Sequence, residues 1–201
     1  MKEERVTFPA GRIAIEGLFA GENGTRAAVV THPHSLMGGS MMNNVVDAMV
    51  EGFLRKGIST LRFNFRGVGR SGGSFENGVG EQEDVKGALR FLGEKGFAGI
   101  ILSGYSFGAW VNSRVASAPH DFSDIIMVSP PMDFLSFDFA AMKGKCGLII
   151  CGDRDQFCPL GRITAEAEGI GAKLCIVRGA DHFYFGMEEE IADYIGGYLD
   201  A

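Results

Sequence analysis

One serine lies in a pattern that can make a hydroxyl nucleophilic. Ser106 is the centre of Gly104-Tyr105-Ser106-Phe107-Gly108, which follows the apolar run 99–103. A strand that ends in Gly-x-Ser-x-Gly indicates a nucleophile elbow, a sharp strand-to-helix turn that holds the serine hydroxyl up for attack. Glycine-rich turns after strands are common, however, and a serine in such a turn often only caps the next helix. The rest of the chain must therefore supply the other catalytic groups.

A nucleophilic serine needs a general base, and the chain contains four histidines. Three of them lie in the turn after an earlier strand or past the helix that follows the serine, namely His32, His34 and His120. The fourth, His182 in Gly179-Ala180-Asp181-His182-Phe183, comes directly after the last predicted strand. Position and elimination therefore predict His182 as the base.

The base must be oriented by an acid, and the segment 152–159 offers two carboxylates. Asp155 lies further past the predicted strand than Asp153, in a Gly-x-x-Asp arrangement that can present it to His182. Asp153 has Arg154 beside it and can simply hold the loop, and either aspartate can serve only as a turn residue. We predict Asp155 as the acid.

An oxyanion hole needs two backbone donors. The N–H of Phe107, directly after the nucleophile, is the first. The second is expected from the turn after the strand at 27–31, where Pro33 has no N–H, so the backbone of His34 is favoured. The His34 side chain either contacts substrate or is a partly exposed loop imidazole.

The apolar patterns predict an α/β fold. Alternating residues around Pro9-Ala10-Gly11 predict an N-terminal antiparallel hairpin. Continuous apolar strands then alternate with amphipathic helices, which requires a mostly parallel sheet with helices on both faces. The predicted strands are 27–31, 58–65, 99–103, 124–128, 147–151 and 173–177; the predicted helices lie at about 45–54, 82–92, 107–117, 163–167 and 191–198.

This arrangement brings the candidate catalytic residues to one rim, because ligands bind at the carboxyl ends of parallel strands. The chain has no internal repeat, linker or low-complexity tract, so residues 1–201 are expected to form a single domain.

Composition restricts the partners. A net charge of −6 argues against nucleic acid or an anionic membrane as partner. The N-terminus has no signal-peptide pattern and no run is long enough to span a bilayer, so we expect a cytoplasmic protein. The cysteines lack ligand spacing and are expected to be buried free thiols. We expect no cofactor and no metal, and the oligomeric state is not predictable.

Two motifs invite other functions. His32-Pro33-His34 lacks the nearby carboxylates or thiolates of a zinc site. Gly67-Val68-Gly69 with Gly72 matches a dinucleotide fingerprint, but helical periodicity resumes only at about Gln82. A tight structural turn is therefore the favoured interpretation of these glycines.

The combined motifs resemble a small, lidless member of the α/β-hydrolase superfamily, similar to bacterial dienelactone hydrolases and carboxylesterases. Four segments in order carry the resemblance: His32-Pro33-His34 with Gly38-Gly39, 61–69 with Ser71, 104–108 and 179–183. The resemblance implies a Ser106, Asp155, His182 triad with His34 and Phe107 as the oxyanion hole. Dienelactone hydrolases proper use a cysteine where this chain has Ser106.

The interval 129–146 is too short for a lid domain and rich in large apolar residues. Together with Phe107, Leu36 and Phe183, its side chains, including Phe134 and Phe137, either line an apolar groove for an acyl or alcohol group or fill the core.

The expected activity is that of a serine hydrolase acting on a small ester or thioester. A peptidase or amidase, a thioesterase, and a non-catalytic ligand-binding protein that retains the fold are the alternatives.

Overall fold

The computed structural model describes residues 2–21, 24–117 and 122–200. In these residues, strands form one sheet in the order β1-β2-β4-β3-β5-β6-β7-β8. The strands are β1 (Glu4–Ala10), β2 (Ile13–Ala20), β3 (Arg26–Thr31), β4 (Ser59–Phe63), β5 (Gly99–Tyr105), β6 (Asp124–Val128), β7 (Cys146–Gly152) and β8 (Lys173–Val177). The helices are α1 (Asn44–Leu54), α2 (Val79–Glu94), α3 (Phe107–Ala116), α4 (Leu160–Ile170) and α5 (Glu188–Leu199). The predicted α/β fold is confirmed.

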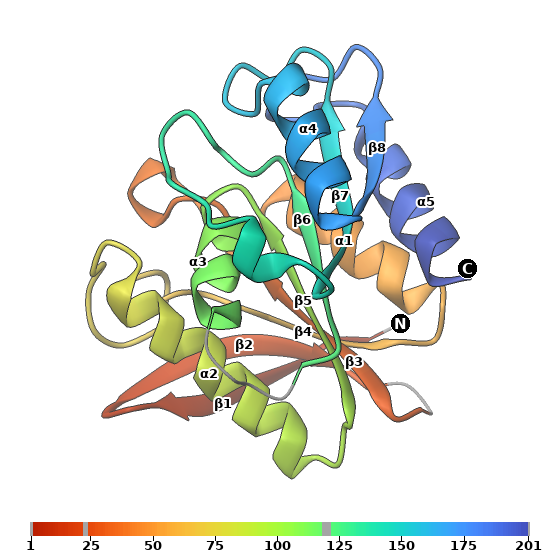
Figure 1. The fold of residues 1–201 in the computed structure, drawn as a ribbon. Helices are drawn as coiled ribbons and strands as arrows, with labels where there is room; N and C mark the ends of the chain where they lie inside the picture. Colours follow the sequence, from red (N-terminus) through yellow and green to blue (C-terminus); the bar gives the residue numbers. More distant parts are fainter. Residues whose placement is uncertain (1, 22–23, 118–121, 201) are drawn as a thin grey trace.

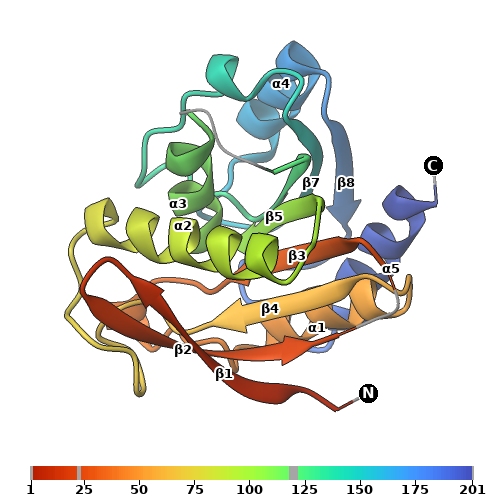
Figure 2. The same ribbon diagram turned by 90° about the horizontal axis from the view of Figure 1, so that it is seen from below.

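Helices bury both faces of the sheet, which explains why residues 27–30 of the central strand β3 are apolar on both sides. In β3, Ala27 and Val29 pack with residues of α2 and α3. Ala28 and Val30, which point the other way, pack with residues of α1 and α5. Figures 1 and 2 show α1 and α5 together on one face and α2, α3 and α4 on the other.

The N-terminal hairpin is present, with a tighter turn than predicted. β1 pairs antiparallel with β2, and β2 with β4, whereas the other neighbouring strands are parallel. Pro9 and Ala10, expected in the turn, instead pair with Ala14 and Ile13 at the end of β1. An edge strand tolerates a proline because it has a free side that needs no N–H donor. Gly11 makes the turn with a φ of 62°.

Helix α2 begins at Val79, three residues before the predicted start. The Glu81 carboxylate accepts hydrogen bonds from the N–H groups of Gly78 (2.7 Å) and Glu76 (3.0 Å), which fixes the first turn. Helix α4 also begins earlier than predicted, at Leu160. Within the described ranges, no helix has both the length and the apolar character that crossing a bilayer requires.

The glycine-rich loop between β4 and α2 is a structural turn. Gly67 and Gly69 have φ values of 76° and 58°. Arg66 binds the buried Asp84 of α2 through its backbone N–H (2.9 Å) and its guanidinium (2.8 Å). The loop is thereby tied to the helix that follows it. The four cysteines are buried and free, as predicted.

Candidate active site

Three predicted residues follow three parallel strands at their carboxyl ends. Ser106 comes directly after β5, Asp155 follows β7 and His182 follows β8. Parallel strands end at one edge of the sheet, so these side chains, 76 and 27 residues apart in the sequence, come into hydrogen-bonding contact.

Ser106 occupies a strained turn between β5 and α3. Its φ and ψ are 55° and −118°, a region that non-glycine residues adopt at a cost of about 1–3 kcal/mol. The flanking glycines provide space. A Cβ at Gly104 would lie 2.6 Å from the Ala109 nitrogen, and one at Gly108 would lie 2.5 Å from Thr31 Oγ1. The Gly-x-Ser-x-Gly spacing thus lets α3 start close to β3 and β5, while the serine itself carries the strain.

His182 links the serine to the aspartate. Its Nε2 lies 2.9 Å from Ser106 Oγ, and its Nδ1 lies 2.9 Å and 3.0 Å from the two carboxylate oxygens of Asp155. An ionised carboxylate only accepts hydrogen bonds, so Nδ1 carries the hydrogen and Nε2 is free to accept from the serine hydroxyl. This is the tautomer that a general base requires.

Asp155 is held as an anion. Its Oδ1 accepts from the backbone N–H groups of Phe157 (2.8 Å) and Cys158 (3.1 Å). Burial by itself would raise the pKa of Asp155, but hydrogen bonds and charge from His182, with help from Ser129 and Phe157, outweigh it and hold the pKa below its usual range. The Asp155 carboxylate is therefore ionised at neutral pH, where it can accept the hydrogen bond from Nδ1 of His182.

The other candidates for base and acid do not join this cluster. Asp153 is exposed, and its Oδ1 accepts from the Gly179 N–H (2.6 Å), so it fixes the loop before His182. His120 lies outside the described residues.

His32 is fully buried, and both ring nitrogens are engaged within the fold. Its Nε2 accepts from the Phe65 N–H (3.0 Å), so its Nδ1 carries the hydrogen and donates to the Pro33 carbonyl (2.7 Å). Burial lowers the pKa of His32 to about 4, although the bond to Pro33 opposes the shift. His32 is therefore a neutral structural residue.

This burial predicts a loss of stability in mild acid. As pH falls through 6.5, the unfolded chain takes up a proton on His32, whereas the folded chain does so only near pH 4. Stability present above pH 6.5 should decline by about 3 kcal/mol by pH 4. Urea unfolding of the wild type and His32→Asn across this pH range measures the effect. The unfolding free energy of the variant should lack this decrease in acid. The same decrease in both proteins would contradict the prediction.

His34 and Phe107 lie side by side, with their ring centroids 4.9 Å apart. The His34 carbonyl accepts from the N–H groups of Met37 and Gly39, and its Nδ1 accepts from Leu36 N–H at 3.3 Å. These bonds involve the carbonyl and the ring of His34. None of them uses its backbone N–H, which is the predicted second donor to the oxyanion. Phe107 is the first residue of α3, where a backbone N–H has no intrahelical partner. Burial lowers the pKa of His34.

Three of the four predicted substrate-binding side chains are exposed. Leu36 is 73% exposed and Phe134 is 70% exposed. Phe134 packs on Phe157, which in turn packs on the His182 ring at 4.7 Å. Phe183 is half-exposed and lies 5.8 Å from the same ring. The fourth, Phe137, is half-buried, stacks on a buried phenylalanine and packs against the core.

Sequence reasoning missed three hydroxyl groups around the predicted triad. Tyr105 donates to the His182 carbonyl oxygen (2.7 Å), and Tyr184 and Ser129 form a buried pair close to Asp155. Tyr105 adjoins Ser106, Tyr184 is two residues from His182, and Ser129 directly follows β6. Their positions in the sequence, next to predicted site residues or to the carboxyl end of a strand, were the signal that could have identified these three residues.

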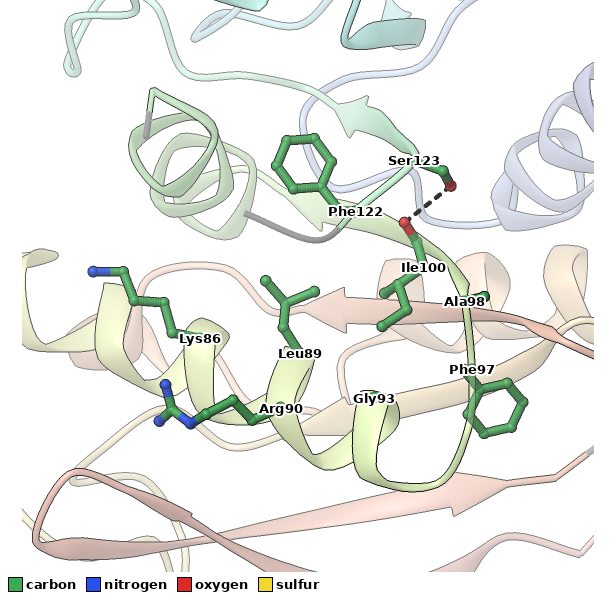
Figure 3. A pocket seen from close by; sticks show the side chains of 9 residues that line it. All are labelled: Lys86, Leu89, Arg90, Gly93, Phe97, Ala98, Ile100, Phe122 and Ser123. Carbon is green, nitrogen blue, oxygen red and sulfur yellow. Dashed lines mark hydrogen bonds between the residues drawn. The ribbon is translucent and has the colours of Figure 1, made fainter. Parts of the chain in front are cut away.

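A cavity of about 610 Å³ lies at the opposite end of the sheet, near the start of β5 and β6 (Figure 3). Its lining includes Lys86 and Arg90 of α2 and the aromatic rings of Phe97 and Phe122. Ser123 in its wall donates to the Ile100 carbonyl (3.1 Å). Because Ser106 lies at the carboxyl end of β5, this cavity is separate from the candidate active site.

Comparison with known proteins agrees with this fold. No family model matches the chain. An uncharacterised protein of Rickettsia prowazekii is 34% identical over 205 residues, covering 95% of this chain and 85% of that protein. An α/β serine hydrolase homologue from Coxiella burnetii is 32% identical, with a TM-score of 0.88 over 99% of this chain and 98% of the other. A lidless α/β serine hydrolase from Xanthomonas campestris is 28% identical, with a TM-score of 0.84 over 100% and 94%. With this fold and this degree of identity, the chain belongs to the α/β serine hydrolases, among members without a lid.

Proposed function

We propose that this chain is a serine esterase that cleaves a small carboxylic ester or thioester through an acyl-enzyme on Ser106. The observation that carries the proposal is the His182 imidazole, which lies within 2.9 Å of both Ser106 Oγ and the Asp155 carboxylate. Its tautomer suits proton transfer from the serine.

The geometry supports a two-step reaction. His182 Nε2 takes the Ser106 proton as Oγ attacks the substrate carbonyl, and the imidazolium then gives that proton to the leaving alcohol or thiol. Asp155 orients the ring and stabilises its charged form. Water, activated by the same nitrogen, then hydrolyses the acyl-enzyme. The N–H groups of Phe107 and His34 are the proposed donors to the oxyanion.

The exposed apolar side chains favour a substrate with an apolar acyl or alcohol group. Phe183 contacts the His182 ring and Phe134 reaches it through Phe157, whereas Leu36 is exposed beside His34. None of the three side chains carries a cation that could bind a charged group. An anionic carrier such as a phosphorylated thiol finds no matching charge on these three side chains, so a simple ester is favoured over a coenzyme thioester.

A substrate panel tests the reaction class. Nitrophenyl esters of increasing acyl length, matched thioesters and matched anilides are incubated with the folded protein. We expect hydrolysis of esters and slower or no cleavage of anilides, whose amine leaving group needs stronger protonation. Hydrolysis of none of them, together with no labelling by a fluorophosphonate, contradicts the proposal. Preferential cleavage of anilides favours an amidase.

We predict that Phe134 contributes to substrate binding and Phe137 to stability. Phe134→Ala should raise KM for longer acyl esters by roughly three- to tenfold, with kcat for an acetyl ester unchanged, because only ground-state apolar contact is lost. Phe137→Ala is the matched control, because it removes the same ring from the same segment. It should cost about 1–3 kcal/mol of unfolding free energy and leave the chain-length preference unaltered. Kinetics across acyl lengths and urea unfolding distinguish the two; a reversed pattern contradicts the assignment.

A further inference from the structure

Tyr105, the last residue of β5, directly precedes Ser106 and reaches the backbone of His182. Its hydroxyl donates to the His182 carbonyl oxygen at 2.7 Å, and its ring centroid lies 5.3 Å from that of the imidazole. Both residues are buried. A buried carbonyl that loses its donor costs free energy, so this bond gives the His182 peptide a preferred position.

The alternation of side chains along β5 explains why the tyrosine meets this loop. Successive side chains of a strand point to opposite faces, so Tyr105 lies on the same face as Ile101. Both belong to the core cluster that includes residues of α1 and α5. His182 lies in the loop that leads from β8 into α5, and the phenol at the end of β5 meets that loop.

Other segments hold the same loop on either side of His182. The Ala180 carbonyl accepts from a backbone N–H of the loop between β7 and α4 (3.0 Å). The Phe183 carbonyl accepts from the side-chain amide of Asn44 in α1 (3.0 Å). These bonds fix the path of the loop, whereas the bond from Tyr105 is made to His182 itself.

The contacts of Tyr105 close a cycle through both residues of the proposed proton transfer. Ser106 is joined to Tyr105 by a peptide bond, and Tyr105 holds the His182 carbonyl. The His182 ring then returns to Ser106, with Nε2 2.9 Å from Oγ. A shift of the held carbonyl therefore also moves Nε2 relative to Oγ. Proton transfer depends on this distance, and a misplacement of about 1 Å can cost on the order of a hundredfold in rate.

We propose that Tyr105 is a positioning residue whose hydroxyl holds the His182 carbonyl and thereby keeps Nε2 within hydrogen-bonding reach of Ser106 Oγ. The proposal rests on the proposed function, in which His182 is the base. A phenylalanine at 105 would fill the same volume and keep the contact between the rings. It would leave the His182 carbonyl without this donor.

The phenol keeps the hydrogen that it donates. Burial, together with the charges of Asp155 and Asp181, raises the pKa of Tyr105 well above its usual range. A carbonyl oxygen can only accept, so the direction of the bond is fixed.

Tyr105→Phe tests the proposal, because it removes one oxygen and keeps the ring. We expect kcat for a nitrophenyl ester to fall by about three- to tenfold, the effect of one lost hydrogen bond. KM should stay within about twofold of wild type, since the buried hydroxyl binds no substrate and His182 serves both acylation and deacylation. A residue with only a packing role would lower the free energy of unfolding and leave kcat of the folded protein unchanged, and that result would overturn the proposal.

Two comparisons establish whether Tyr105 acts through His182. Tyr194→Phe removes a phenol bond to another backbone carbonyl, that of Ile176 on β8 (3.1 Å), and should leave kcat and KM unchanged. In a His182→Gln background, Tyr105→Phe should reduce the residual hydrolysis no further, because the residue through which it acts is gone. An additive loss in the double variant, or an equal loss of kcat in Tyr194→Phe, would overturn the proposal.

A measurement without substrate distinguishes failure of this inference from failure of the proposed function. The His182 Nδ1–H that donates to Asp155 should give a downfield proton resonance, assigned by its loss in His182→Gln. In Tyr105→Phe this hydrogen should exchange with solvent about three- to tenfold faster, because the loop opens more often, and in Tyr194→Phe at the wild-type rate. Faster exchange supports the inference even if no ester is hydrolysed and no fluorophosphonate reacts, results that would contradict the proposed function alone. An unchanged exchange rate overturns the inference even if the wild type is an active esterase.

Discussion

Ser106→Ala should lower ester hydrolysis by about 10⁴- to 10⁶-fold in kcat, because the attacking oxygen is lost and the remaining groups cannot form an acyl-enzyme. The residual rate should be that of direct attack by water on the bound ester, with the oxyanion donors still stabilising the intermediate. The same variant should no longer be labelled by a fluorophosphonate, which the wild type should bind covalently, with a mass increase on the peptide that contains residue 106. Steady-state kinetics and mass spectrometry measure the two effects.

Ser103→Ala provides the matched control for this substitution. Ser103 lies on β5 three residues before Ser106 and is fully buried, and its Oγ has no hydrogen-bond partner within the described part of the chain. Its removal should leave activity and labelling at wild-type levels. Equal labelling of the wild type and Ser106→Ala would show that the probe reacts elsewhere and would remove Ser106 as the nucleophile.

Much of the fold was predictable because most of the parallel strands are apolar on both faces. The run 27–31 has no polar alternation, since β3 is covered on both sides, and this pattern predicts a central parallel strand. Once the strands were placed, their carboxyl ends gave the relative positions of Ser106, Asp155 and His182. The distances between these side chains agree with the predicted triad, whose catalytic role stays a prediction until activity is measured.

Residues that depend on long-range contacts were not predictable in the same way. Helix α2 starts between two glycines, which have poor helix propensity. A Cβ at Gly80 would lie 2.0 Å from the Arg66 guanidinium, a contact that local pattern does not reveal. Ser129 and Tyr184 are 55 residues apart and meet only through the arrangement of strands. Sequence periodicity therefore identified the elements but missed this buried hydrogen-bonded pair.

Asp155→Asn should lower kcat for ester hydrolysis by about 10⁴-fold with little change in overall structure, because it imposes the wrong imidazole tautomer. The N–H groups of Phe157 and Cys158 both donate to Oδ1, so the amide oxygen of the variant must take that position. Its NH₂ then occupies the site of Oδ2, 2.9 Å from Nδ1 of His182. Nδ1 must accept, the ring hydrogen moves to Nε2, and Nε2 can no longer accept the proton of Ser106.

Asp153→Asn is the matched control, because it makes the same chemical change two residues away in the same loop. Asp153 accepts from the Gly179 N–H, and the amide oxygen of asparagine can also accept this bond. Activity should therefore stay within about twofold of wild type, with at most about 1 kcal/mol lost in unfolding free energy. A large loss of kcat in Asp153→Asn with full activity in Asp155→Asn would reverse the assignment of the acid. Equal, small losses in both would mean that His182 is oriented chiefly by other contacts, such as the Tyr105 hydroxyl on its carbonyl.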